Sequence, residues 1–249
     1  MAMRERLISL VVVAVLLPGL VLAESDVAAI KLDADGKIHC DFLRAHHAFL
    51  ERAKDPGIGI VFLGDSITNG WSWGDHTQLW DRYFGRYDPA NFGIGGDRTE
   101  HVLWRIDNGE LDRVRPKVVV LLIGTNNIGD PTDEIRRGVV RVTERVREKL
   151  PETRLVLMGI FPRGAEPSDP NRAKIREVNR ALAKLDDGDR VRFLDIGDRF
   201  LAPDGSLPKE IMPDALHLSF KGYQIWAEAL APILEEVMSC HPERSEGPG

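Results

Sequence analysis

Ser66 is the first residue in this sequence whose type and position could do chemistry. It follows the apolar run Ile58–Leu63, which predicts a buried strand. A serine at a strand-to-helix turn presents its hydroxyl at the sheet edge, beside backbone N–H groups that favour a developing negative charge. Such a serine suits a nucleophile. Taken alone, however, the segment Gly64–Thr68 favours a helix cap, because Asp and Ser are both preferred N-cap residues.

A histidine that could activate this serine lies far along the chain. Asp214 and His217 are three residues apart, just before the last predicted helix, and side chains at this spacing can meet across a turn. The pair would supply an oriented imidazole, usable as a general base. A lone histidine on a loop is more often solvated surface. The other histidines have no comparable partner and are assigned no role: His39, His46, His47, His76, His101 and His241.

Two further segments offer hydrogen-bond donors for an oxyanion. The glycines of Gly93–Gly96 can present bare N–H groups, although Arg98 stands where a dinucleotide-binding fingerprint needs its third glycine. Asn126 follows the apolar run Val118–Ile123, and its amide needs a partner there, either a substrate oxygen or a turn. A nucleophile, a base with its acid and two donors together favour a serine-dependent acyl hydrolase.

These groups need a scaffold that brings the ends of several strands together. Apolar runs predict strands at Ile58–Leu63, Val118–Ile123, Leu155–Ile160 and Val191–Ile196, and a shorter strand ends at Gly93. Helical patterns lie between them, over residues 102–106, 135–150 and 175–185, with others at 41–54 and after 222. The alternation predicts an α/β fold with a parallel sheet in a three-layer sandwich, whose working groups gather at the carboxyl ends of the strands.

The composition narrows the classes of protein that remain. A chain of 249 residues with 43% hydrophobic and 29% charged residues suits one large globular domain, and a net charge of −6 lacks the electrostatic footprint of a nucleic-acid binder. Two cysteines, Cys40 and Cys240, are too few for a disulfide-dense scaffold or a four-cysteine zinc site. Helices at the two termini could bring them together, but two separate thiols are the favoured interpretation.

Residues 1–23 have the three-part pattern of a secretory signal. Arg4 and Arg6 precede the uncharged apolar run Leu7–Leu17, and the segment ending at Ala23 predicts cleavage after that residue. The hydrolase domain would then span residues 24–238 and be exported, to the periplasm or outside the cell, without stable membrane insertion. An uncleaved membrane anchor is the alternative, disfavoured because Pro18-Gly19 interrupts a short run. Residues 239–249 are expected to form a disordered tail.

The four segments together resemble the SGNH, or GDSL-type, hydrolase superfamily. Its signature blocks match in order, with Ile67 in place of a leucine, and the resemblance spans about residues 40 to 238: Gly64–Ile67, Gly93–Asp97, Gly124–Asn127 and Asp214–His217. Within it, Asn91–Arg105, Asn108–Leu111 and Phe161–Gly164 closely resemble the catalytic subunits of platelet-activating-factor acetylhydrolase and its bacterial relatives. The resemblance implies a flavodoxin-like α/β/α sandwich with a five-stranded parallel sheet.

The resemblance also implies a role for each site residue. Ser66 would be the nucleophile, His217 would take its proton, and Asp214 would orient His217. The oxyanion hole would comprise the backbone N–H groups of Ser66 and Gly96 and the side-chain amide of Asn126. The implied reaction is hydrolysis of a short-chain carboxylic ester, most of all an acetyl ester, through an acyl-enzyme. This mechanism needs neither a metal nor an organic cofactor.

The substrate is less constrained than the chemistry. Trp71 and Trp73 could line the alcohol side of a cleft, as for a small-molecule or glycan ester, or could simply pack the loop. A lysophospholipase or thioesterase is the alternative enzyme. A non-catalytic glycan-binding module and a nucleotide-binding flavodoxin-like protein are alternatives from other classes, disfavoured by the intact catalytic set and the failed glycine fingerprint respectively. The sequence leaves the oligomeric state open, and a homodimer is one of the states it allows.

Overall fold

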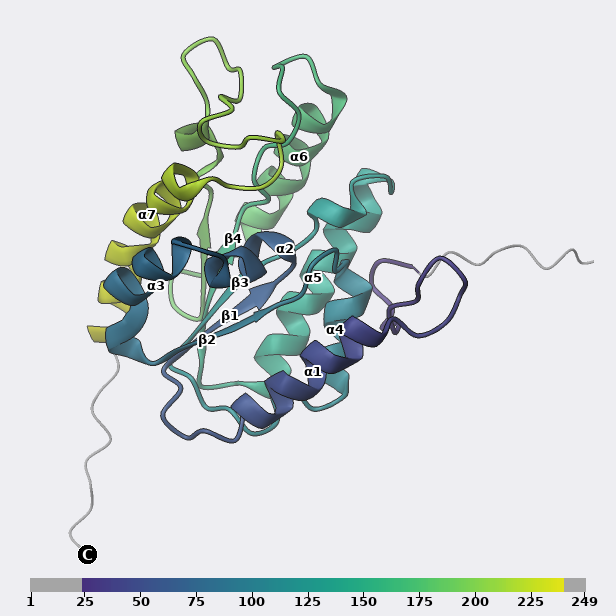
Figure 1. The fold of residues 1–249 in the computed structure, drawn as a ribbon, viewed down its shortest axis with the longest axis vertical. Helices are drawn as coiled ribbons and strands as arrows, with labels where there is room; N and C mark the ends of the chain where they lie inside the picture. The colour runs from purple at the N-terminus through teal and green to yellow at the C-terminus, as the bar shows by residue number, and fades with distance from the viewer. Residues whose placement is uncertain (1–23, 240–249) are drawn as a thin grey trace, which may run out of the picture.

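A five-stranded parallel sheet forms the centre of the computed structural model, which describes residues 24–239 (Figure 1). The strand order is β2-β1-β3-β4-β5, with every neighbouring pair parallel. The strands are β1 (Ile60–Gly64), β2 (Pro89–Gly93), β3 (Val118–Leu122), β4 (Arg154–Met158) and β5 (Val191–Leu194). Strands β1 and β3 are buried at every position, as the apolar runs predicted.

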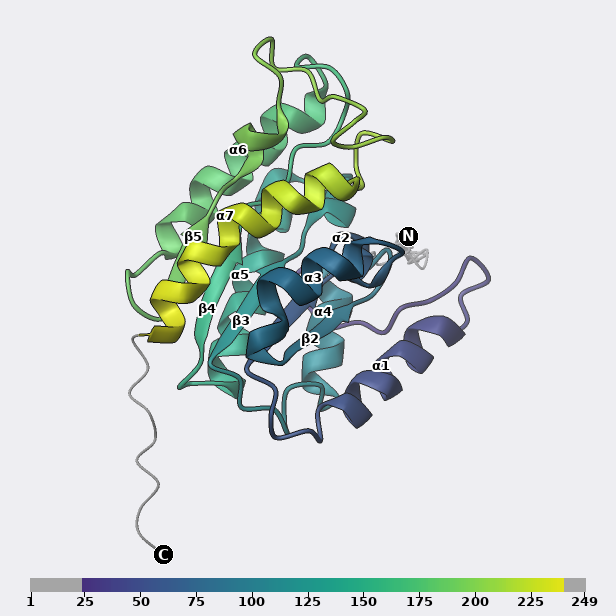
Figure 2. The same cartoon turned by 60° about the vertical axis from the view of Figure 1, so that its left-hand side comes forward.

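Helices cover both faces of this sheet (Figures 1 and 2). One face carries α1 (Cys40–Arg52), α4 (Thr99–Asp107), α5 (Thr132–Lys149) and α6 (Pro170–Leu182), and the other carries α2 (Ser66–Asn69), α3 (His76–Phe84) and α7 (Phe220–Ser239). Short 3₁₀ helices occupy residues 70–72, 85–87, 125–127, 183–185 and 197–200. The predicted three-layer α/β/α architecture is thus confirmed.

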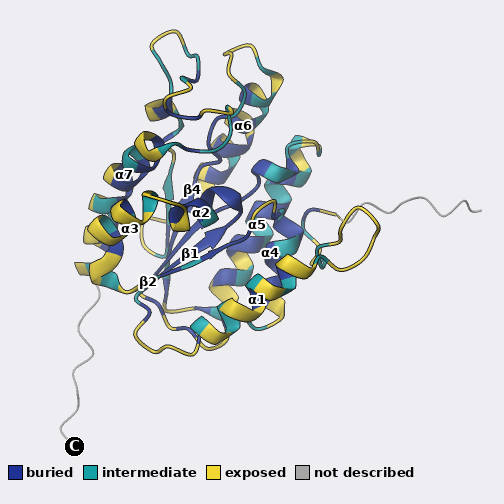
Figure 3. Ribbon diagram, in the orientation of Figure 1, coloured by how far each residue is buried: buried dark blue, intermediate teal, exposed yellow. Residues whose placement is uncertain are grey.

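The protein has two hydrophobic cores, one on each face of the sheet, and side chains that alternate along each strand enter one core or the other. In β1, Val61 and Leu63 pack with the α4–α5 side, whereas Ile60 and Phe62 pack with the α3–α7 side. Figure 3 shows the result, with buried strands at the centre and exposed residues on the outer surfaces of the helices. Helices therefore cover both faces of the sheet. Its edge strands and the ends of its strands are what remains for a functional site.

The order in which strands join the sheet reverses at β1, which lies between β2 and β3. The carboxyl ends of the three strands are level, since Gly64 pairs with Gly93 on one side and with Leu122 on the other. Connections that leave in opposite directions at such a switch point open a crevice between them. The three signature segments that follow these strands accordingly begin together, at the carboxyl end of the sheet.

Several boundaries differ from the sequence prediction. Ile123, Ile160 and Ile196 are buried but lie just beyond strands β3, β4 and β5, so the apolar runs predicted strands that were too long. Helix α3 was missed. Ser239, expected in the tail, is the last residue of α7.

The terminal helices do not meet, which was the alternative that the two cysteines left open, because α1 and α7 lie on opposite faces of the sheet (Figure 2). Cys40 is exposed at the start of α1, while Cys240 lies outside the described residues. The predicted signal segment 1–23 and residues 240–249 also lie outside them. Within residues 24–239, no helix is long and apolar enough to cross a membrane.

Candidate active site

Ser66 is the first residue of α2 and directly follows β1 through Asp65. The capping function belongs to Asp65, whose Oδ1 accepts a hydrogen bond from the Ile67 N–H at 2.9 Å. The Ser66 hydroxyl is therefore free for another partner, and its Oγ lies 2.9 Å from His217 Nε2. Ser66 and His217 are 151 residues apart in sequence, and the fold brings them into hydrogen-bond contact.

Asp214 holds His217 through both ring and backbone. Its Oδ2 lies 2.7 Å from His217 Nδ1, and its Oδ1 accepts from the backbone N–H groups of His217 at 2.7 Å and Leu216 at 3.0 Å. Ala215 adopts a left-handed backbone conformation with φ of 58°, which curls the loop tightly enough for these contacts. With Nδ1 donating to Asp214, Nε2 is the nitrogen left to accept the Ser66 proton.

The same contacts keep Asp214 ionised. Burial opposes ionisation, but hydrogen bonds from the His217 ring and from the two backbone N–H groups outweigh it and lower the pKa of the Asp214 carboxyl. A carboxylate beside the imidazole stabilises the imidazolium that forms when His217 takes a proton. The three side chains thus have the geometry and charge of an acid–base–nucleophile relay.

Gly96 and Asn126, the predicted oxyanion donors, lie on two adjoining segments. The Asn126 side-chain amide donates to the carbonyl of Asp97 at 2.8 Å, which leaves its second N–H available. Gly96 has φ of 71°, a conformation that suits glycine. Within residues 24–239, the Gly96 N–H donates to no other group. Both segments follow strands that flank β1, so they begin at the same end of the sheet as Ser66.

Asn127, beside Asn126, has a different task. It is fully buried, its amide nitrogen lies within 3.2 Å of Ser25, Glu100 and Asp130, and its oxygen accepts from the Thr99 N–H at 3.0 Å. These contacts fix the amino end of α4. The two adjacent asparagines therefore separate into one with a free donor and one wholly occupied by the fold.

Arg105 is a buried residue of the site that the sequence reasoning missed. Its guanidinium donates to the carbonyls of Gly64 at 3.2 Å and Phe92 at 3.1 Å, and it forms ion pairs with Asp97 at 2.9 Å and Glu110 at 2.5 Å. It thus ties the ends of β1 and β2 to the glycine segment. An arginine on the otherwise apolar face of the predicted helix was the available signal.

Burial also perturbs the acids next to Ser66. It raises the pKa of Asp65 to about 7, although the Ile67 N–H opposes the shift. It raises the pKa of Asp97 to about 6, against the opposing charges of Arg105 and Lys31. Both residues are fully buried, and perturbed acids of this kind are frequent near functional sites.

The two tryptophans after Ser66 occupy different environments. Trp71 is 1% exposed and packs in the α3–α7 core. Trp73 is 44% exposed, and its ring centroid lies 6.3 Å from that of His217. Only Trp73 is thus placed to touch a bound substrate, while Trp71 packs the loop.

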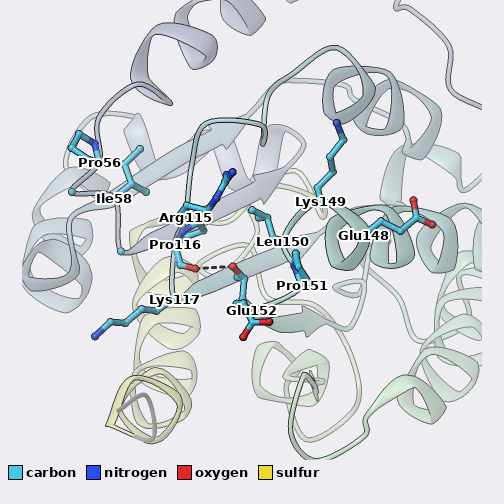
Figure 4. A pocket seen from close by; sticks show the side chains of 13 residues that line it. Pro56, Ile58, Arg115, Pro116, Lys117, Glu148, Lys149, Leu150, Pro151 and Glu152 are labelled. Atoms are coloured by element: carbon cyan, nitrogen blue, oxygen red, sulfur yellow. Dashed lines mark hydrogen bonds between the residues drawn. The ribbon is translucent and has the colours of Figure 1, made fainter. Parts of the chain in front are cut away.

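A large cavity of about 880 Å³ lies at the opposite end of the sheet (Figure 4). It is lined by residues that precede β1, β3 and β4, among them Ile58, Lys117 and Thr153, and by the end of α5. Within this lining, Thr153 Oγ1 donates to the carbonyl of Pro116 at 2.7 Å. None of the predicted site residues lines this cavity. Across residues 24–239, no cluster of three His, Cys, Asp or Glu side chains could hold a metal ion.

Known proteins resemble this chain over most of its length. The profile of the GDSL-like lipase/acylhydrolase family matches residues 62–225. The platelet-activating factor acetylhydrolase IB subunit alpha1 of Homo sapiens is 38% identical over 199 residues, covering 80% of this chain and 84% of the relative. The alpha2 subunit of Rattus norvegicus is 32% identical over 206 residues, covering 82% and 88%.

Solved structures share the fold at lower identity. A GDSL-like lipase from Bacteroides thetaiotaomicron has a TM-score of 0.64 at 18% identity, covering 79% of this chain and 98% of that one. An acetylxylan esterase from Geobacillus stearothermophilus has a TM-score of 0.57 at 19% identity, covering 74% and 96%. These likenesses show that the five-stranded sheet and its helical layers recur in hydrolases.

Proposed function

Since the chain belongs to the GDSL-like lipase/acylhydrolase family and is a carboxylic ester hydrolase of that type, we propose that it removes short acyl groups, most of all acetyl, by serine catalysis. The observation that carries this proposal is the continuous relay from Asp214 to His217 at 2.7 Å and from His217 to Ser66 at 2.9 Å. The proposed nucleophile, base and orienting acid are these three residues.

The proposed reaction proceeds in two similar halves. Ser66 Oγ attacks the ester carbonyl while His217 Nε2 takes its proton, and the oxyanion accepts hydrogen bonds from the N–H groups of Ser66 and Gly96 and the amide of Asn126. The imidazolium then protonates the leaving alcohol, which departs and leaves an acyl-Ser66. Water, activated by His217, attacks this acyl-enzyme and releases the carboxylic acid and the free serine.

The preference for acetyl groups is supported by the relatives. The two mammalian relatives are described as acetylhydrolases, and the chain covers more than four fifths of the length of each. Trp73, half-exposed beside His217, supports an aromatic contact on the alcohol side of the ester. A lysophospholipase or thioesterase would instead need to hold a long acyl chain.

Three measurements test the proposal. Purified Ser66→Ala should lose nearly all hydrolysis of p-nitrophenyl acetate, and parental activity in this variant would disprove the nucleophile. A series of p-nitrophenyl esters should favour acetate, whereas preference for acyl groups of eight or more carbons would support the lipolytic alternative. A fluorophosphonate probe should label Ser66, and a non-catalytic glycan-binding module would give no adduct.

We also propose that the chain is exported after cleavage behind Ala23, on the basis of its first 23 residues. The measurement is the N-terminal sequence of the protein recovered from periplasm or medium after expression in a bacterial host. A mature chain beginning at Glu24 supports export with cleavage. A chain that stays in the membrane fraction with Met1 intact supports the anchor instead.

A further inference from the structure

Lys31 reaches the glycine segment from a part of the chain that precedes α1. Its Nζ donates to the carbonyl of Gly95 at 2.5 Å and lies 3.3 Å from Asp97 Oδ1. Its side chain is only 13% exposed and the Asp97 side chain is fully buried. We propose that Lys31 is a positioning residue for catalysis, which holds the Gly95–Gly96 peptide so that the Gly96 N–H faces the oxyanion. This inference rests on the proposed function.

The peptide unit itself explains why such a grip matters. The carbonyl of Gly95 and the N–H of Gly96 belong to one planar, trans peptide group, so they point in opposite directions. An ammonium fixed on the carbonyl oxygen therefore fixes the direction of the N–H on the other side. The same contact polarises the amide, because hydrogen bonds in a chain strengthen one another, and a polarised N–H is a better donor.

Within the described residues, this peptide is otherwise held only by the turn around it, which the Asp97 N–H closes by donating to the Ile94 carbonyl at 3.2 Å. It joins two glycines, and a Cβ placed on Gly95 would meet nothing within 4 Å. Gly96 has φ of 71°, in the left-handed region, which glycine adopts about as readily as negative φ. Because neither glycine has a side chain, no side chain of these two residues would hinder rotation of the peptide plane. The nearest atom to a Cβ built on Gly96 is Lys31 Nζ at 3.3 Å, which places the ammonium directly against this unit.

The neighbouring residue is anchored independently, which makes the role of Lys31 specific. Asp97 is held through its carboxylate by Arg105 at 2.9 Å and through its carbonyl by the Asn126 amide at 2.8 Å. Loss of Lys31 would leave those two contacts in place. The Gly95 carbonyl, in contrast, has Lys31 as its hydrogen-bond donor within the described residues.

Lys31 is itself positioned by the fold. The chain before α1 runs beside α4 and α5 (Figure 1), where Thr99 Oγ1 donates to the Ser25 carbonyl at 2.6 Å and the Ala29 N–H donates to the Glu100 carbonyl at 3.0 Å. Beyond Lys31 the chain turns back, and an antiparallel bridge joins Leu32 to Ile38. The ammonium therefore comes from an ordered segment docked on the helix that follows the glycines.

The test compares Lys31→Met with Lys37→Met, which removes an exposed lysine from the same turn. For p-nitrophenyl acetate, we expect kcat of Lys31→Met to fall by about 10- to 100-fold, less than for loss of an oxyanion donor, with KM within about twofold of the parent. Lys37→Met should match the parent. Lys31→Arg restores a cationic donor. If kcat of Lys31→Met is about 100-fold below the parent, kcat of Lys31→Arg should be at least about tenfold above that of Lys31→Met.

A second readout separates positioning from a merely structural role. A boronic acid forms a tetrahedral adduct on the serine and uses the oxyanion donors, so its affinity should weaken in Lys31→Met in parallel with kcat. This affinity is measured at a temperature well below the unfolding midpoint of each variant. If Lys31→Met does not fold, the same two measurements on Lys31→Gln, which keeps a neutral donor, should show the loss in reduced form.

Two outcomes overturn the inference. One is a kcat and a boronic acid affinity within twofold of the parent in the folded variant, and the other is a loss that falls on KM alone. Ser66→Ala is assayed alongside. If that variant keeps parental activity, the proposed function fails, whereas an inactive Ser66→Ala beside a fully active Lys31→Met removes only the role of Lys31.

Discussion

The hydroxyl of Tyr223, on α7, donates to the carbonyl of Ile67, on the helix that carries Ser66, at 2.6 Å. Both residues are 1% exposed. Helix α7 follows the loop that bears His217, so one buried hydrogen bond links the helix that begins at Ser66 to the helix behind the His217 loop. A Cβ on Gly70 would lie 2.0 Å from the Tyr223 hydroxyl, which shows how closely the two elements approach.

Tyr223→Phe should therefore lower both stability and turnover. It leaves the Ile67 carbonyl buried without its donor, which costs about 1–3 kcal/mol of unfolding free energy. We expect kcat to fall with it, because Ser66 begins the helix that the bond restrains. Urea denaturation and steady-state kinetics on the purified variant measure the two effects. Unchanged stability would show that the bond contributes nothing to the fold.

Asn126→Ala and Asn127→Ala should fail in different ways. The first removes a free donor at the sheet edge, so kcat should drop by about 10²- to 10³-fold while the unfolding midpoint changes little. The second breaks the buried contacts with Thr99 and Glu100, so the midpoint should fall clearly. Thermal unfolding and kcat, measured on both variants, give the comparison. A reversal of the two patterns would contradict the assignment.

Asp65 should make the stability depend on pH. Its carboxyl has a pKa of 3.8 when unfolded and about 7 in the fold, where burial and then the nearby Asp97 charge favour the neutral form over the opposing Ile67 N–H. Folding therefore takes up a proton between these values. The stabilisation that Asp65 provides is complete below pH 3.8 and is lost as the pH rises through about 7.

Asp65→Asn keeps an oxygen for the Ile67 N–H but cannot ionise. Its unfolding free energy relative to the parent should consequently rise between pH 5 and pH 8, as measured by urea denaturation at both values. Glu152→Gln, which removes a carboxylate whose side chain is 88% exposed, serves as the control. A difference between Asp65→Asn and the parent that is the same at both pH values would refute the proposed protonation.

The two tryptophans predict a separation of binding from stability. Trp73→Ala should raise KM for esters of aromatic alcohols while leaving the unfolding free energy nearly unchanged, because the side chain is 44% exposed. Trp71→Ala should instead cost about 3–5 kcal/mol of stability, since it empties a large volume in the core. Kinetics with phenyl and ethyl acetate, together with urea denaturation, measure both. An equal effect of Trp73→Ala on KM for the two esters would argue against an aromatic contact.

The meeting of Ser66 with His217 follows a rule that a sequence can supply. Parallel strands end at a common edge, so polar residues placed just after apolar runs were expected to gather there. The expectation of five parallel strands was confirmed on the same basis. Helix α3 escaped because its buried residues, Leu79 and Phe84, are too few to establish a periodicity.

The supports of the site were harder to foresee than the reacting groups. Lys31 contacts Gly95 across 64 residues, and Arg105 contacts Gly64 across 41. Neither contact follows from a periodic pattern or a spacing, because both depend on how a loop and a helix dock on the finished sheet. Long polar side chains in such positions resemble ordinary surface residues until the packing around them is known.

The side chains of His217 and Asp214 remain 35% and 55% exposed. Bulk solvent therefore has a direct route to the imidazole. Water can reach His217 to hydrolyse an acyl-serine without a large opening motion of the protein. An added small alcohol that reaches the exposed imidazole should therefore compete with water for the acyl group, and the yield of its ester would measure that competition.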